Sequence, residues 1–133
     1  RVLFRSIGHF LKKNNYQVDL IVSSTAKRAQ ATSSLIHGIL NLSTEIFDEE
    51  ELFQASVRNY LDMINGFDDD FRNILVVGHN PYISYFAEHL TKAEIKSMET
   101  AGLVSIRFDI SKWSEVKEGN GSFENYIHPS IID

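Results

Sequence analysis

Apolar residues occur along the chain in two alternating patterns, short continuous runs and stripes at helical spacing. The runs at 19–23 and 74–77 are rich in β-branched residues, as expected of strands, and the run at 74–77 is predicted to be covered on both faces. A stripe with a period of three to four residues follows each run, over 26–40 and over 83–90. Each of these two strands is therefore predicted to lead directly into a helix.

The rest of the chain continues the alternation. The further predicted elements are a helix at 7–11, a strand at 44–47, a helix at 57–64 and strands at 103–110 and 123–127. Strands that alternate with helices in this way predict an α/β sandwich with a largely parallel sheet. No repeat, low-complexity tract or linker interrupts the pattern, so we interpret residues 1–133 as a single domain.

The junction Gly-His-Asn-Pro at 78–81 carries the most chemical information. Gly78 lets the chain turn tightly, Asn80 is predicted to be the N-cap of the next helix, and Pro81 its first residue. His79 would then lie at the C-terminal end of a strand, beside a helix N-terminus. The free N–H groups and partial positive charge of such a terminus favour a phosphate.

The junction after the first strand contains two cations. Ser24 or Thr25 is predicted to cap the helix, and Lys27 and Arg28 lie in its first turn. The helix dipole disfavours each charge there by roughly 0.3 to 1 kcal/mol, which a bound anion would offset. Arg28 is the stronger candidate because a guanidinium can hold two phosphoryl oxygens. Ligands gather at the C-terminal ends of parallel strands, so Arg28 and His79 are predicted to converge on one phosphate.

Composition narrows the alternatives. The 133 residues are 43% hydrophobic and 23% charged, which is typical of a globular domain. A net charge of −5 argues against nucleic-acid binding, and no apolar stretch is long enough for a membrane span. The absence of cysteine suits a reducing compartment, so we expect a cytoplasmic protein. None of the five histidines has metal-ligand spacing, so neither a metal nor another cofactor is expected.

Two segments resemble those of a known family. The nine residues at 24–32, Ser-Thr-Ala-Lys-Arg-Ala-Gln-Ala-Thr, resemble the Ser-x-x-x-Arg-Ala-x-x-Thr segment of the histidine phosphatase superfamily, and 78–81 resembles its second-histidine motif. The segments 50–56 and 100–106 are similar to those of the SixA-type phosphohistidine phosphatases. Thr25 stands where the family often has proline. The resemblance implies a phosphoglycerate mutase-like, three-layer α/β/α sandwich with a mixed sheet.

The resemblance also implies roles for individual residues. The family works through a phosphohistidine intermediate, in which Arg28 would be the second phosphate-clamping arginine and His79 the second histidine. Asn80 is placed with them as a phosphate-binding residue. An acidic proton donor is expected from Glu50 or Glu51, and Glu50 is favoured. The implied activity is a cofactor-independent phosphatase that acts on phosphohistidine in a protein or on a small phosphomonoester.

The Arg-His-Gly motif that supplies the nucleophile in this family is absent from the chain. We therefore expect the chain to be N-terminally truncated, with the first strand missing and the remaining fragment inactive. Residues 1–6 match one translated frame of a common sequencing-adapter end and are hypothesised not to be native; an ordinary strand or helix fragment is the alternative. Two other functions stay open: a noncatalytic phosphate-binding or regulatory module, and a mutase of the same superfamily.

Overall fold

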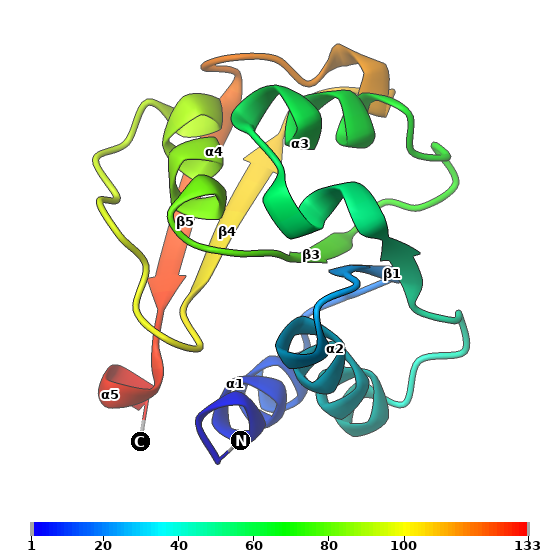
Figure 1. The fold of residues 1–133 in the computed structure, drawn as a ribbon, viewed down its shortest axis with the longest axis vertical. Helices are drawn as coiled ribbons and strands as arrows, with labels where there is room; N and C mark the ends of the chain where they lie inside the picture. The colour runs from blue at the N-terminus through cyan, green and yellow to red at the C-terminus, as the bar shows by residue number, and fades with distance from the viewer. Residues whose placement is uncertain (1, 133) are drawn as a thin grey trace.

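The structure, a computed structural model, describes residues 2–132 and alternates helices with strands (Figure 1). The elements are α1 (Val2–Lys13), β1 (Leu20–Ser24), α2 (Lys27–Leu40), β2 (Phe47–Glu49), the 3₁₀ helix η1 (Glu50–Gln54), α3 (Val57–Asn65), β3 (Ile74–Val77), α4 (Tyr82–Thr91), β4 (Leu103–Phe108), the 3₁₀ helix η2 (Trp113–Glu115), β5 (Gly121–Ile127) and α5 (Pro129–Ile132). None of the helices within residues 2–132 is long and apolar enough to cross a membrane.

The helix predicted at 7–11 extends over most of the hexapeptide at the start of the chain, because α1 begins at residue 2. Residue 1 lies outside the described residues. Whether residues 1–6 are native stays a prediction.

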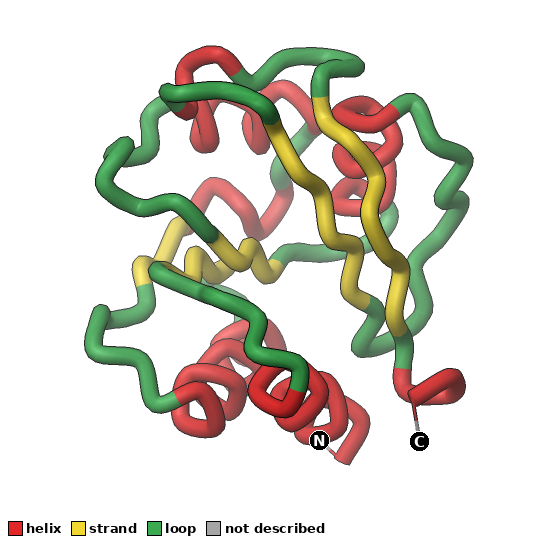
Figure 2. Tube along the Cα trace, turned by 180° about the vertical axis from the view of Figure 1, so that it is seen from behind, coloured by secondary structure: helices red, strands yellow, loops and turns green. Residues whose placement is uncertain are grey.

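The strands form two separate sheets, as the view from behind shows (Figure 2). One is a parallel three-stranded sheet in the order β2-β1-β3, and the other is the antiparallel pair β4-β5. The predicted mixed α/β class is confirmed. Parallel and antiparallel pairs are both present, although no pairing joins the two sheets within the described residues.

Helices cover both faces of the three-stranded sheet (Figure 1). Helices α1 and α2 lie on one side, and α3 and α4 lie on the other. Successive side chains of a strand point to opposite faces. Accordingly, Leu20 and Val22 of β1 belong to the core beneath α3 and α4, whereas Ile21 belongs to the core with α1 and α2. This division produces the three layers.

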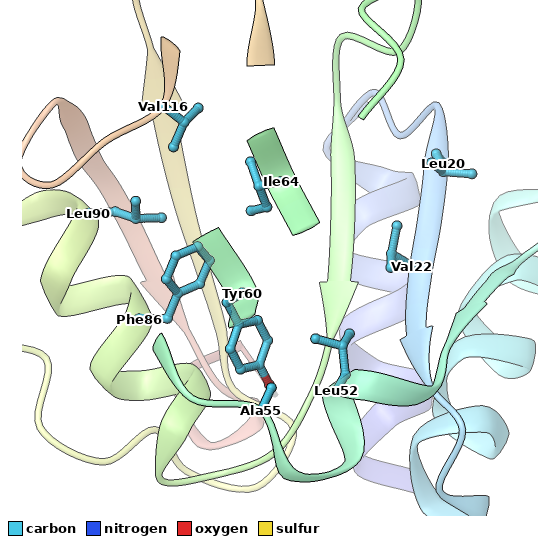
Figure 3. Close-up of a cluster of buried hydrophobic side chains, with 9 residues drawn as sticks. All are labelled: Leu20, Val22, Leu52, Ala55, Tyr60, Ile64, Phe86, Leu90 and Val116. Carbon is cyan, nitrogen blue, oxygen red and sulfur yellow. The ribbon is translucent and has the colours of Figure 1, made fainter. Parts of the chain in front are cut away.

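Tyr60 is the largest fully buried side chain in the core that contains α3 and α4. Its ring stacks on that of Phe86 with the centroids 5.2 Å apart, and Leu52 of η1 belongs to the same cluster (Figure 3). The Tyr60 hydroxyl reaches the end of β3, where a Cβ added to Gly78 would stand 2.0 Å from its oxygen. Glycine is therefore required at position 78 for close packing against Tyr60.

One prediction about a strand is wrong in detail. The strand predicted at 44–47 begins only at Phe47, because Thr44 is engaged elsewhere: its hydroxyl donates to the carbonyl oxygen of Asp19 at 2.7 Å, and its carbonyl oxygen lies 2.7 Å from Nε2 of His37.

The strand at 74–77 has the predicted bounds. Its side chains pack alternately against the core with α3 and α4 and the core with α1 and α2, so both faces are covered as predicted. The four residues are half-buried, and the strand lies at an edge of its sheet.

Candidate functional site

The ends of β1 and β3 bring the two predicted phosphate-binding side chains together. Ser23 pairs with Val77 in the parallel ladder, so Arg28 and His79 follow strand ends that lie side by side. Both residues line an open pocket of about 350 Å³. The pocket is lined by Ala26, Lys27, Arg28, Phe53 and His79. The predicted convergence of Arg28 and His79 at one sheet edge is therefore confirmed.

The first junction, from β1 into α2, leaves the helix start uncapped. The prediction that Ser24 or Thr25 caps this helix is wrong: the N-cap is Ala26, which makes no side-chain cap hydrogen bond. The Ser24 hydroxyl instead accepts the N–H of Ala26 at 3.2 Å, one residue before the helix. The first turn also contains no acidic residue. Within the described residues, no side chain caps the N–H groups of this first turn, so they can bind an anion.

Lys27 and Arg28 add side-chain cations to this helix start. Both are exposed, and neither takes part in a salt bridge among the ion pairs of the described residues. The Arg28 carbonyl oxygen accepts the Thr32 hydroxyl at 3.0 Å, which ties the backbone of the first turn to the next turn. The Arg28 guanidinium is thus carried on an ordered turn and has no acidic partner.

The second junction, from β3 into α4, is held by side chains. The helix begins at Tyr82 with Pro81 as its N-cap, so the prediction of Asn80 as N-cap and Pro81 as first helical residue is wrong by one position. The Asn80–Pro81 peptide bond is cis. Asn80 Nδ2 donates to the Met98 carbonyl oxygen at 2.9 Å, and its Oδ1 accepts the Ser84 hydroxyl. The Asn80 amide therefore fastens a later loop to α4 and does not line the pocket.

Two hydroxyl groups position His79. Its backbone N–H donates to the Tyr60 hydroxyl oxygen at 3.3 Å, and its ring Nε2 lies 2.7 Å from the Ser24 hydroxyl. Ser24 is fully buried and closes β1, so this contact joins the two junctions directly. Sequence reasoning treated Ser24 only as a possible helix cap. The available signal was its place at the end of a strand, in the segment that also contains Arg28.

The environment of His79 favours a neutral ring. Burial lowers the His79 pKa below its ordinary value of 6.5, and the nearby positive charge of Arg28 lowers this pKa further. A bound anion would have the opposite effect, because an opposite charge within a few ångströms favours the charged form. The pocket is therefore able to take up a proton on His79 when it receives an oxyanion.

The segment after β2 contributes Phe53 to the pocket instead of the predicted acid. Glu50 is exposed at the start of η1 and is not among the residues that line the pocket. The neighbouring Glu49 carboxylate accepts the Glu51 N–H at 3.5 Å and caps η1. The assignment of Glu50 as proton donor stays a prediction. Phe53 was not predicted, because nothing in the local pattern shows which way a short 3₁₀ helix turns its side chains.

Comparison with known sequences gives distant matches. No protein-family model matches the chain. Two uncharacterized proteins of Mycobacterium tuberculosis, MT1313 of strain CDC 1551 and Rv1276c of strain H37Rv, are each 29% identical to it. Each alignment covers 92% of this chain and 80% of the relative.

Comparison with solved structures is more informative about the fold. The protein histidine phosphatase SixA in complex with tungstate superposes with a TM-score of 0.83 at 22% identity, covering 98% of this chain and 81% of that one. Two structures assigned as phosphohistidine phosphatase SixA give similar results. The one from Nakamurella multipartitia has a TM-score of 0.80 at 19% identity and covers 96% of this chain and 80% of its own. The one from Agrobacterium tumefaciens has a TM-score of 0.76 at 20% identity, and the superposition covers 95% of this chain and 78% of that one.

These superpositions place the chain in the α/β class to which the histidine phosphatases belong. More narrowly, it has the fold of the SixA-type phosphohistidine phosphatases. The fold that the sequence resemblance implied is thereby confirmed.

Proposed function

We propose that the chain is the greater part of a phosphatase domain that removes a phosphoryl group from phosphohistidine in a protein or from a small phosphomonoester. The observation that carries this proposal is the convergence of Arg28 and His79 in one pocket at the ends of adjacent parallel strands. SixA, which shares the fold, was solved with tungstate, an oxyanion of phosphate-like shape. That complex supports an oxyanion as the ligand here.

The pocket offers two of the groups that phosphoryl transfer needs, the Arg28 guanidinium and the His79 ring. A nucleophilic histidine would attack phosphorus, forming an N–P bond as the bond to the leaving group breaks, and water would then hydrolyse the phosphoenzyme. Arg28 would hold two equatorial oxygens, and protonated His79 would donate to a third. The leaving group would receive its proton from a carboxylic acid, for which Glu50 is the candidate. We expect no metal in this reaction.

The nucleophile requires a further segment, because the 133 residues contain no Arg-His-Gly. We place that motif at the end of a strand that pairs with the open edge of β3. Within the described residues β3 pairs only with β1, and β4 pairs only with β5, so each has an edge without a strand partner. All four residues of β3 are apolar and half-exposed, and an edge of this kind is a template for another strand.

The test compares the 133-residue chain with a longer protein that includes the upstream coding sequence. The short chain should bind tungstate or phosphate, with shifts in the NMR signals of His79, but should not turn over p-nitrophenyl phosphate. The longer protein should hydrolyse phosphohistidine, and replacement of its Arg-His-Gly histidine by alanine should abolish turnover.

Two outcomes would contradict this proposal. Turnover by the 133-residue chain that is lost on His9→Ala or His37→Ala would place the nucleophile elsewhere. A longer protein that binds the oxyanion without hydrolysing any phosphorylated substrate would establish the noncatalytic phosphate-binding module, which the missing motif favours if no such strand exists.

A further inference from the structure

The pocket has one aromatic wall, which the oxyanion chemistry does not use. The Phe53 side chain lines the pocket together with Arg28 and His79, and Phe53 is 54% exposed. Its ring approaches that of His79 edge-on, with the centroids 6.0 Å apart and the planes inclined by 62°. One part of the Phe53 ring therefore contacts the site, while the rest is open to whatever is attached to the bound phosphoryl group.

The position of Phe53 is set by the residues around it. Leu52, which precedes Phe53 in η1, and Ala55, the C-cap of η1, are almost completely buried in the core beneath α3 and α4. The Glu49 carboxylate caps the start of η1. Because its neighbours are anchored inward, Phe53 is held outward, at the mouth of the pocket. An ordered aromatic ring loses little conformational freedom when a ligand stacks on it.

Exposure alone does not distinguish Phe53. Phe47 of β2 is 49% exposed, but it is not among the pocket-lining residues. Single exposed aromatic residues are ordinary on protein surfaces. What singles out Phe53 is that its exposed ring stands beside the two side chains that would hold a phosphoryl group.

We propose that Phe53 is a specificity-determining residue, which stacks on a planar ring that carries the phosphoryl group. The pocket would thus select phosphoryl groups borne on an imidazole or aryl ring over those on an aliphatic chain. Aromatic rings prefer edge-to-face or offset contacts at the separation already seen between Phe53 and His79. This inference rests on the proposed phosphate site.

The test measures dissociation constants of the 133-residue chain by NMR titration with three probes: inorganic phosphate, phenyl phosphate and propyl phosphate. The chain is expected to bind phenyl phosphate more tightly than propyl phosphate, and Phe53→Leu to reduce this preference by about two- to tenfold. Phe53→Trp should preserve the preference. Phe47→Leu, the matched control on an equally exposed aromatic residue, should change nothing.

The outcomes separate this inference from the proposed function. A reduced phenyl-to-propyl preference in a Phe53→Leu protein that still binds inorganic phosphate would support the role of Phe53. Equal preference in the wild-type and Phe53→Leu proteins, with phosphate still bound, would overturn that role and leave the phosphate site intact. Failure of the wild-type chain to bind inorganic phosphate would overturn the phosphate site, and the Phe53 inference with it.

Discussion

The two strand-to-helix junctions that form the pocket have equivalent places in the sheet but opposite designs. At the start of α2 the N-cap is Ala26, no side chain caps the helix, and Arg28 and Lys27 have no acidic partners among the described salt bridges. The start of α4 has no side-chain cap either, but there side chains fasten the loop: Asn80 bonds the Met98 carbonyl, and the backbone N–H of His79 donates to Tyr60. We call the junction before α2 the open junction, because it carries the fixed charges of Lys27 and Arg28. The junction before α4 is the closed junction, because side-chain hydrogen bonds fasten its loop and it holds a single titratable ring.

This difference indicates that the two junctions have separate roles in binding an anion. Free N–H groups and unpaired cations attract an anion of almost any shape, but they do not fix its orientation. A ring held at its backbone by Tyr60 and at Nε2 by Ser24 provides a donor at a defined position. We therefore expect changes at the open junction to affect affinity, and changes at the closed junction to affect stability and geometry.

The largest effect is expected at the open junction. Arg28→Ala should weaken tungstate binding by roughly 10- to 150-fold, because a hydrogen bond to a charged group contributes about 1.5 to 3 kcal/mol. Arg28→Lys should restore little of the tungstate affinity, since an ammonium lacks the planar pair of N–H donors of a guanidinium. The unfolding free energy should change by less than about 0.5 kcal/mol, because the side chain is exposed. Calorimetric titration and urea unfolding measure the two quantities. Unchanged affinity in Arg28→Ala would reduce this residue to a solvated cation.

At the closed junction, Gly78→Ala should destabilise the protein by about 1 to 3 kcal/mol, because the added Cβ would overlap the buried Tyr60 hydroxyl. Urea unfolding measures the change. Gly38→Ala is the matched control: a Cβ at that helical position meets nothing within 4 Å, and the substitution should stabilise α2 by roughly 0.5 to 1 kcal/mol. Equal effects of the two substitutions would show that Tyr60 does not hold the turn.

The contact between the junctions can be tested with two buried serines. Ser24→Ala removes the hydroxyl beside His79 Nε2 and should cost about 0.5 to 1.5 kcal/mol of unfolding free energy. Ser33→Ala removes a buried hydroxyl that has no hydrogen-bond partner among residues 2–132, so it should be neutral or stabilising. Both serines are fully buried, which makes the pair well matched. If Ser33→Ala proved the more damaging of the two, the bond across the junctions would have little energetic weight.

The smallest effect is expected from pH. The His79 pKa lies below 6.5, and a bound anion would raise it, so binding should take up a proton. Sulfate affinity should therefore rise by a few fold as the pH falls from about 7.5 to 6, within the tenfold-per-unit limit for one proton. His79→Asn should flatten this profile in calorimetric titrations. A pH dependence that survived the substitution would assign the proton to another group.

The same shift predicts the pH dependence of stability without an anion. Because the unfolded chain binds a proton at His79 before the folded chain does, stability should fall as the pH drops below 6.5. Saturating sulfate should remove this loss.

Short-range patterns in the sequence were enough to predict several elements. The bounds of β3 were predicted without error and those of β1 within one residue, because a continuous apolar run depends only on neighbours along the chain. The sequence also predicted that Arg28 and His79 lie together, since their strand-end positions follow from the alternation of strands and helices.

The remaining details of the pocket depend on how the chain packs in three dimensions. Ser24 became a partner of His79 because β1 and β3 pair in a particular register. Asn80 does not line the pocket, because its side-chain amide donates to the carbonyl oxygen of Met98, which is distant in sequence. Phe53 lines the pocket because its neighbour Leu52 is buried beneath α3 and α4. Each of these outcomes depends on contacts between residues distant in sequence, and such contacts leave no periodic trace in the chain.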